Sequence, residues 1–203
     1  MHPSHLRTRK TQRIAPGEYA VLSGDAVIST LLGSCVAACL YDPGAGVFGM
    51  NHFLLSTRRF ATDMPLSLTD AGRYGIHSME LLINSMMRQG ARREKILAKA
   101  FGGAAIYATP EEAGSFNRVG SVNGKFIKEF LMNEGIPLVA ADLGGEQGRV
   151  IYFDSEDFSV YVRKIAKWQS TVVAKRDHKW WEVSLKAQER EQEASMNSDS
   201  WLL

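Results

Sequence analysis

The sequence has few of the residues that mark disulfide-rich or membrane-spanning proteins. It contains only two cysteines in 203 residues, and these lie four positions apart, at Cys35 and Cys39. In an extended strand their Cα atoms would stand roughly 13 Å apart, which is beyond the reach of a disulfide bond. No apolar run approaches the roughly 18 residues of a membrane span. The sequence therefore predicts free thiols and no membrane insertion.

A strong charge of one sign is also missing. The formal net charge is +2, which is too small to indicate a nucleic-acid partner. The first fourteen residues are basic, but they lack the apolar stretch and the small-residue cleavage site of a secretory signal. We expect residues 1–14 to form a solvated basic arm, and we expect a cytoplasmic location.

Short β-prone segments and two amphipathic helices fill the chain from residue 17 to residue 165. In the first helix, Met79, Leu82, Ile83 and Met86 follow the spacing of one helical face. The strands are grouped and do not alternate regularly with helices, so we predict a mixed α/β (α+β) domain over residues 15–167. The predicted strands are 19–22, 27–32, 36–41, 47–55, 96–101, 138–141, 150–153 and 158–162, and the predicted helices are 70–90 and 119–133.

The composition changes after Lys167. Residues 168–203 are rich in Lys, Glu, Gln and Ser and carry no continuous apolar stripe. We predict a polar C-terminal extension that is partly disordered.

One segment contains residues suited to nucleophilic chemistry. A catalytic cysteine needs a nearby base and fixed donors for an oxyanion. Gly33 permits a tight turn that would expose the sulfur of Cys35 and aim the backbone amides around Ser34 at a carbonyl. The turn 42–44 would bring His52 back beside the cysteine. A buried cysteine is more often a small core residue, so both interpretations stay open for Cys35, while the core role is favoured for Cys39.

A metal centre is not indicated by these residues. Cys35, Cys39 and His52 match no structural zinc spacing, and a fourth ligand is missing. We expect no metal and no other cofactor.

Several motifs in order resemble the CheD family over roughly residues 17–165. They are TLLGSCVAACLYDP (30–43), GMNHFLL (49–55), KAFGGA (99–104) and EFLMNEGIPLVAADLGGEQGR (129–149). Members of that family deamidate glutamine side chains on methyl-accepting chemotaxis receptors. The resemblance implies a protein-glutamine glutaminase, an amidohydrolase in which Cys35 is the nucleophile, His52 the base and Thr30 the residue that orients the imidazole. It also implies a three-layer sandwich, with two β layers and one helical layer, similar to the deamidase domain of cytotoxic necrotizing factor toxins.

The resemblance also implies how the substrate is recognised. The target glutamines would lie on a helical coiled coil, and Asn51, Arg58 and Arg59 are candidates for the rim of a shallow site, although two solvated arginines are an equally good interpretation. Two positions depart from the family pattern: Ser56 stands where proline is common, and Val122 where arginine is usual.

Two other functions stay open. Some members of the family bind a CheC-type phosphatase, so the chain could act mainly as an adaptor between receptors and such a partner. A cysteine amidase acting on small amides is the third interpretation.

Overall fold

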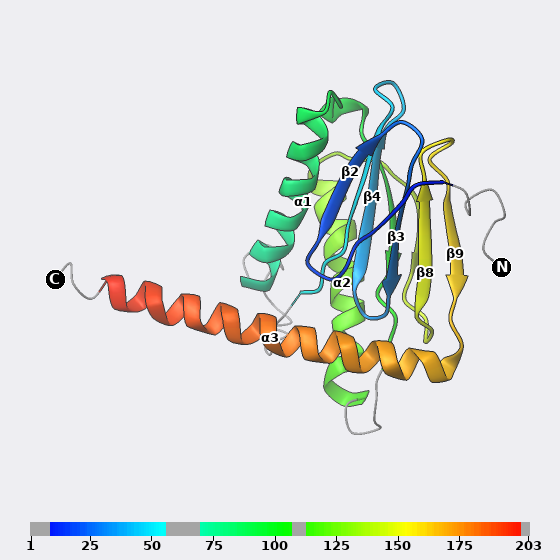
Figure 1. Cartoon of the computed structure of the whole chain (residues 1–203). Helices are drawn as coiled ribbons and strands as arrows, with labels where there is room; N and C mark the ends of the chain where they lie inside the picture. Colours follow the sequence, from blue (N-terminus) through cyan, green and yellow to red (C-terminus); the bar gives the residue numbers. More distant parts are fainter. Residues whose placement is uncertain (1–8, 56–69, 107–112, 200–203) are drawn as a thin grey trace.

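The computed structural model describes residues 9–55, 70–106 and 113–199, which form three stacked layers beside a long C-terminal helix (Figure 1). The first layer is helical, the second is a five-stranded sheet, and the third is a four-stranded sheet. The mixed α/β sandwich predicted from the sequence is confirmed.

The four-stranded sheet has the order β1-β3-β8-β9, with a parallel β1–β3 pair and antiparallel pairs elsewhere. The five-stranded sheet has the order β2-β5-β4-β6-β7, with a parallel β6–β7 pair. The strands are β1 (Thr11–Arg13), β2 (Tyr19–Ser23), β3 (Val27–Leu32), β4 (Val36–Asp42), β5 (Val47–Asn51), β6 (Leu97–Gly102), β7 (Leu138–Leu143), β8 (Arg149–Asp154) and β9 (Val160–Lys164).

Helices α1 (Asp70–Arg88) and α2 (Ala113–Asn133) cover the outer face of the five-stranded sheet, and a short 3-10 helix, η3 (Arg93–Lys95), precedes β6. Successive side chains along β4 point to opposite faces of the sheet, and both sets are apolar, so both faces of the sheet are covered. Val36 and Leu40 pack against the helices, whereas Ala37 and Cys39 pack against the four-stranded sheet. The protein therefore has two cores separated by one sheet.

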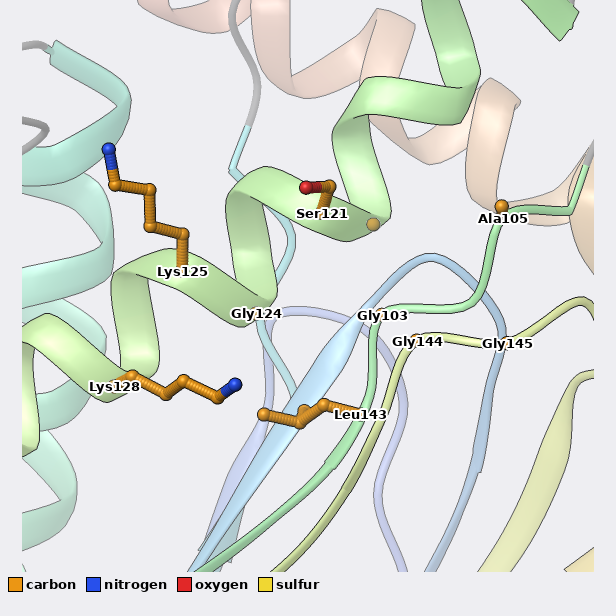
Figure 2. Close-up of a pocket in the computed structure, with 10 residues that line it drawn as sticks. Gly103, Ala105, Ser121, Gly124, Lys125, Lys128, Leu143, Gly144 and Gly145 are labelled. Carbon is orange, nitrogen blue, oxygen red and sulfur yellow. The ribbon is translucent and has the colours of Figure 1, made fainter.

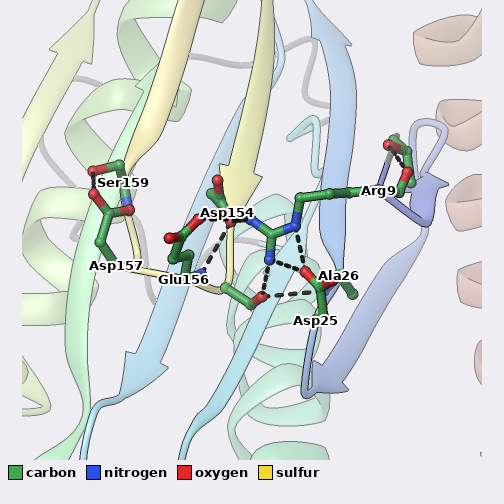
Figure 3. A network of polar contacts seen from close by, with 9 residues as sticks. Arg9, Asp25, Ala26, Asp154, Glu156, Asp157 and Ser159 are labelled. Atoms are coloured by element: carbon green, nitrogen blue, oxygen red, sulfur yellow. Dashed lines mark hydrogen bonds and ion pairs between the residues drawn. The ribbon is translucent and has the colours of Figure 1, made fainter. Parts of the chain in front are cut away.

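The N-terminal arm differs from the solvated segment expected. Strand β1 pairs with β3, and Ile14 after it is buried. The Arg9 guanidinium forms ion pairs with Asp25 and Asp154 and donates a 2.9 Å hydrogen bond to Ser155 Oγ (Figure 3). Acidic residues on the β2–β3 connection and at the end of β8 thus hold Arg9, in the described part of the arm, on the domain.

The C-terminal segment also differs from the partly disordered extension expected. Residues Lys167–Asp199 form a single helix, α3, whose first half crosses one end of the layers (Figure 1). Val173, Ala174 and Leu185 on it are buried. Among the α3 side chains that the structure describes, the buried ones lie between Ser170 and Leu185. Within the described ranges, no helix is long and apolar enough to cross a membrane.

Candidate active site

Thr30 and His52 meet between the two sheets. Thr30 lies in the middle of β3, and His52 directly follows β5. The Thr30 Oγ1 atom lies 2.7 Å from His52 Nδ1 and donates its own proton to the Ile14 carbonyl at 2.8 Å. Since a hydroxyl has one proton to give, the imidazole must carry the proton on Nδ1 and donate it to Oγ1. This tautomer leaves a free lone pair on Nε2.

The His52 Nε2 atom is buried and has no hydrogen-bond partner among the residues that the structure describes. A buried polar atom without a partner is costly, and such atoms in native proteins commonly belong to functional sites. An unprotonated nitrogen held in this way is suited to accept a proton.

Cys35 lies on the same inner face as His52. Val36 and Phe53 form an antiparallel bridge, with N–O distances of 3.0 and 2.9 Å. In this register His52 stands opposite Ala37 and diagonally across from Cys35. Diagonal neighbours across antiparallel strands start about 7–8 Å apart at Cα, a gap that an aromatic side chain can bridge. The structure thus places Thr30 and His52 in contact, and the strand register puts Cys35 on the same face.

The turn that presents Cys35 is held at three consecutive carbonyls. The donors are Ala104 N to Gly33 O at 2.8 Å, Asn123 Nδ2 to Ser34 O at 2.9 Å, and Gly103 N to Cys35 O at 2.7 Å. These bonds fix the backbone of the turn before any substrate arrives, as an oxyanion site requires of its amide donors.

Gly33 is required for a reason different from the one expected. A Cβ at this position would lie 2.2 Å from Ile106 Cδ1, 2.6 Å from the Asp177 carboxylate and 2.8 Å from Val173 Cγ1. Glycine therefore allows the close approach of α3, which contributes Val173 and Asp177. The backbone at Gly33 does not have the positive φ that only glycine adopts easily.

Asp177 is a site residue that sequence reasoning missed. It is fully buried, and its Oδ2 atom accepts hydrogen bonds from Ser34 N at 3.0 Å and Ser34 Oγ at 3.1 Å. The Arg176 guanidinium pairs with its other oxygen at 2.7 Å. No local signal pointed to it, because one aspartate in a segment that mixes charged and apolar residues does not indicate burial.

Asn123 was also missed, although the sequence carries a signal for it. It is fully buried, and its side chain bonds Ser34 O and accepts from Leu55 N at 2.8 Å. It stands on the same helical face as the buried Val119, Phe126 and Ile127. A polar residue within an apolar helix face indicates a buried hydrogen-bonding role.

The structure corrects one of the residues predicted for the substrate rim, Asn51. Asn51 is fully buried on the face away from His52, where Oδ1 accepts from Ala38 N at 3.0 Å and Nδ2 donates to Ser78 Oγ at 3.1 Å. Adjacent residues of a strand point to opposite faces, so Asn51 joins β4 to α1 and does not line the site. Arg58, Arg59 and Ser56 lie outside the described residues. Val122 is partly buried against the helix-side core.

Burial sets the charge state of the site. Desolvation, with a smaller contribution from Arg176, lowers the pKa of His52 to about 3. Desolvation raises the pKa of the Cys35 thiol well above its ordinary value, and the Asp177 carboxylate raises it further. In this arrangement the site holds a neutral thiol beside a neutral imidazole.

Both cysteines are free, as their spacing predicted, and Cys39 packs in the core between the sheets. The sulfur of Cys35 is buried, whereas the turn at Gly33 was expected to expose it. The described part of the chain holds no cluster of three or more His, Cys, Asp or Glu side chains able to bind a metal ion.

A separate open pocket of about 420 Å³ lies beside the glycine-rich turns (Figure 2). Gly103, Gly144 and Gly145 line it with positive φ, and Lys125 and Lys128 of α2 project beside it. It adjoins the Cys35 turn through Gly103, but its lining includes neither Cys35 nor His52.

Comparison with known proteins decides the family. Residues 59–164 match the family model described as CheD chemotactic sensory transduction. The chain belongs to the CheD family. The matched stretch begins after Thr30, Cys35 and His52, but one relative aligns with the whole chain and so covers these positions. A probable chemoreceptor glutamine deamidase CheD 1 of Geobacter sulfurreducens is 61% identical over 100% of this chain and 99% of its own length.

Other CheD proteins are similar over most of their length. The probable chemoreceptor glutamine deamidase CheD 2 of Shewanella oneidensis is 43% identical, with 85% of each chain covered. The CheD of Rhizobium etli is 52% identical over 69% of this chain and 72% of its own.

Two solved structures show a partial likeness. The Bacillus licheniformis hypothetical protein YfiH has a TM-score of 0.37 at 13% identity, covering 61% of this chain and 49% of its own. The Neisseria meningitidis protein NMB0706 has a TM-score of 0.32 at 11% identity, covering 63% and 51%. Scores this low carry no functional conclusion.

Proposed function

We propose that this CheD protein deamidates glutamine side chains of methyl-accepting chemotaxis receptors in the cytoplasm, with Cys35 as nucleophile, His52 as base and Thr30 as the residue that orients the base. The names of its relatives as probable chemoreceptor glutamine deamidases support the substrate. The observation that carries the mechanism is the Thr30–His52 hydrogen bond, which leaves an unprotonated Nε2 on the face shared with Cys35.

The reaction begins with a proton transfer. His52 Nε2 takes the proton of the Cys35 thiol as the sulfur attacks the amide carbon of the substrate glutamine. The carbonyl oxygen becomes an oxyanion, and the backbone amides of the Ser34–Cys35 turn are the donors that stabilise it. The Thr30 hydroxyl holds the imidazolium in place through Nδ1.

Ammonia then leaves. The C–N bond breaks as the nitrogen takes the proton from His52, and a thioester to Cys35 remains. A water molecule, deprotonated by His52, attacks the thioester carbon and releases glutamate and the thiol. The product carries a carboxylate where the substrate carried a neutral amide.

The test is mass spectrometry of the cytoplasmic fragment of a cognate receptor after incubation with the full-length protein. Deamidation adds about 1 Da at each modified glutamine, and it should disappear with Cys35→Ala. Cys39→Ala is a matched control, because Cys39 is an equally buried thiol that faces the same core. Turnover by Cys35→Ala, or its loss in Cys39→Ala alone, would overturn the assignment.

The complete burial of Cys35 favours one second candidate, an adaptor that binds receptors or a CheC-type phosphatase without turnover. The same incubation distinguishes the two. Receptor binding with no mass change at any glutamine, by the wild type and by variants that uncover Cys35, would favour the adaptor.

A further inference from the structure

Helix α3 covers the turn that presents Cys35. Val173 and Ala174 are buried against Ala104 and Ile106, and Trp180 packs within 6.3 Å of the Tyr74 ring, measured between ring centroids. Figure 1 shows this part of α3 crossing the end of the three layers. Cys35 is 0% exposed and His52 is 1% exposed. With α3 in this position, a substrate side chain cannot reach the sulfur.

The residue that α3 places at the turn is a carboxylate. Asp177 Oδ2 accepts from both the backbone amide and the hydroxyl of Ser34, at 3.0 and 3.1 Å. That amide is one of the donors assigned above to the oxyanion. The carboxylate therefore occupies the space that the reacting oxygen of a substrate must enter.

The chemistry of this contact matches the product of the reaction. Deamidation of a receptor glutamine leaves a carboxylate on a helix, and α3 is a helix that carries a carboxylate into the site. We propose that α3 is an internal product mimic, which occupies the surface that binds the receptor helix and places Asp177 where the newly formed glutamate would lie. The receptor helix then binds only when α3 leaves.

This inference rests on the proposed function, because the receptor helix is its assigned occupant. Several contacts besides the Trp180–Tyr74 packing keep α3 seated. They include the Asp177–Ser34 hydrogen bonds, the 3.0 Å bond from Arg176 to the Leu31 carbonyl, and the apolar packing of Val173 and Ala174. The charge of Asp177 also disfavours the Cys35 thiolate, so the resting enzyme holds an unreactive thiol.

The first test measures alkylation of Cys35 by iodoacetamide in the full-length protein, with each cysteine quantified by peptide mass spectrometry. Asp177→Ala should increase the rate at Cys35 by about tenfold or more, because the fraction of molecules with α3 displaced rises. Glu182→Gln removes a charge from an exposed position of the same helix and should leave the rate unchanged. Cys39 should stay protected, which shows that the domain remains folded.

A second pair of variants leaves Asp177 intact. Ala174→Glu places a charge in the buried contact, whereas Val172→Glu places the same charge at a site that is 65% exposed. We expect faster alkylation of Cys35 with Ala174→Glu only. Unchanged protection of Cys35 in both Asp177→Ala and Ala174→Glu would overturn the proposal, as would labelling of Cys35 and Cys39 at equal rates.

Deamidation of the receptor fragment by the same variants separates the two proposals. If the wild type deamidates the receptor and neither Asp177→Ala nor Ala174→Glu increases the turnover rate, the product mimic is overturned and the deamidase assignment stays intact. If Cys35 is alkylated faster in these variants but neither they nor the wild type deamidate the receptor, the deamidase assignment is overturned. The product mimic then falls with it, and α3 only covers Cys35.

Discussion

At the residue scale, one hydroxyl decides the proton position in the site. Thr30 gives its proton to the Ile14 carbonyl and therefore acts only as an acceptor toward His52 Nδ1. A threonine supplies less charge than the aspartate of a serine-protease triad, but it fixes the tautomer equally well. The backbone carbonyl of the N-terminal arm thus takes part in preparing the base.

We expect Thr30→Val to lower the deamidation rate constant about 10- to 100-fold, a part of what a general base supplies. Valine keeps the shape of the side chain but removes the acceptor, so the imidazole can carry its proton on Nε2 and lose its function as a base. Thr30→Ser keeps the hydroxyl and should retain most activity. Equal rates for the valine and serine variants would contradict this role.

The buried His52 predicts a pH dependence of stability. Its pKa is about 3 in the folded protein and about 6.5 when unfolded, so the unfolded chain binds the proton more readily. Stability should therefore fall as the pH drops from 6.5 toward 3, by about 1.4 kcal/mol at pH 5.5 from this group alone.

Urea unfolding of the wild type and of His52→Gln at pH 7.5 and pH 5.5 measures this contribution. The other titrating groups cancel in the difference between the two proteins. His52→Gln should lose less stability on acidification than the wild type does. The same pH dependence in both proteins would show that His52 is protonated in the folded state.

At the scale of elements, β4 and α2 together fix the position of the nucleophile. Strand β4 has one apolar face toward the helices and one toward the second sheet, so the turn before it is anchored between both cores. Helix α2 adds Asn123, which joins the carbonyl of Ser34 to the amide of Leu55. The Asn123 side chain thereby ties the turn that carries Cys35 to the segment after His52.

Asn123→Ala should lower the free energy of unfolding by about 2–4 kcal/mol, because it leaves two buried backbone groups without partners. Ser121→Ala, at an exposed position two residues earlier on α2, should change it by less than about 0.5 kcal/mol. Chemical denaturation of both variants measures the difference. A loss for Asn123→Ala no larger than for Ser121→Ala would mean that the two backbone groups find other partners.

At the scale of the whole molecule, Arg149 joins the two sheets. It lies on β8 of the four-stranded sheet with a side chain that is 1% exposed, and it pairs with the Asp142 carboxylate of β7 at 2.8 Å. Its guanidinium also donates to the carbonyls of Asp142 and Gly144. One buried cation therefore links the strand ends of two layers.

Arg149→Met should destabilise the protein by about 2–3 kcal/mol, as expected for the loss of several charge-assisted hydrogen bonds at a buried site. Arg163→Met, at an exposed position on the adjacent β9, provides the control and should have little effect. Thermal or urea unfolding compares them. Similar stabilities for the two variants would show that packing alone holds the sheets together.

The spacing of residues along the chain was enough to predict much of the domain. A run of β-prone residues between turns predicted β3 with its observed bounds, Val27–Leu32, and the helical period predicted α1. The order of motifs around Thr30, Cys35 and His52 predicted which residues the fold would bring together. The two elements depend on contacts between neighbouring residues, so the pattern of the sequence records them directly. The contact of Thr30 with His52 joins segments of different sheets, and it was predicted through the resemblance to the CheD family.

Only the tertiary structure determined how the site is closed. Ser34 and Asp177 are 143 positions apart, and their hydrogen bond depends on the path of the whole chain. The segment around Asp177 mixes Val173, Trp180 and Trp181 with many charged residues, and its pattern does not indicate which of them contact the domain. Asn51 could not be placed from the sequence for the same reason, because it is buried only where helix α1 covers one face of strand β5. A local pattern identifies the residues capable of chemistry, but long-range packing decides whether they are open to a substrate.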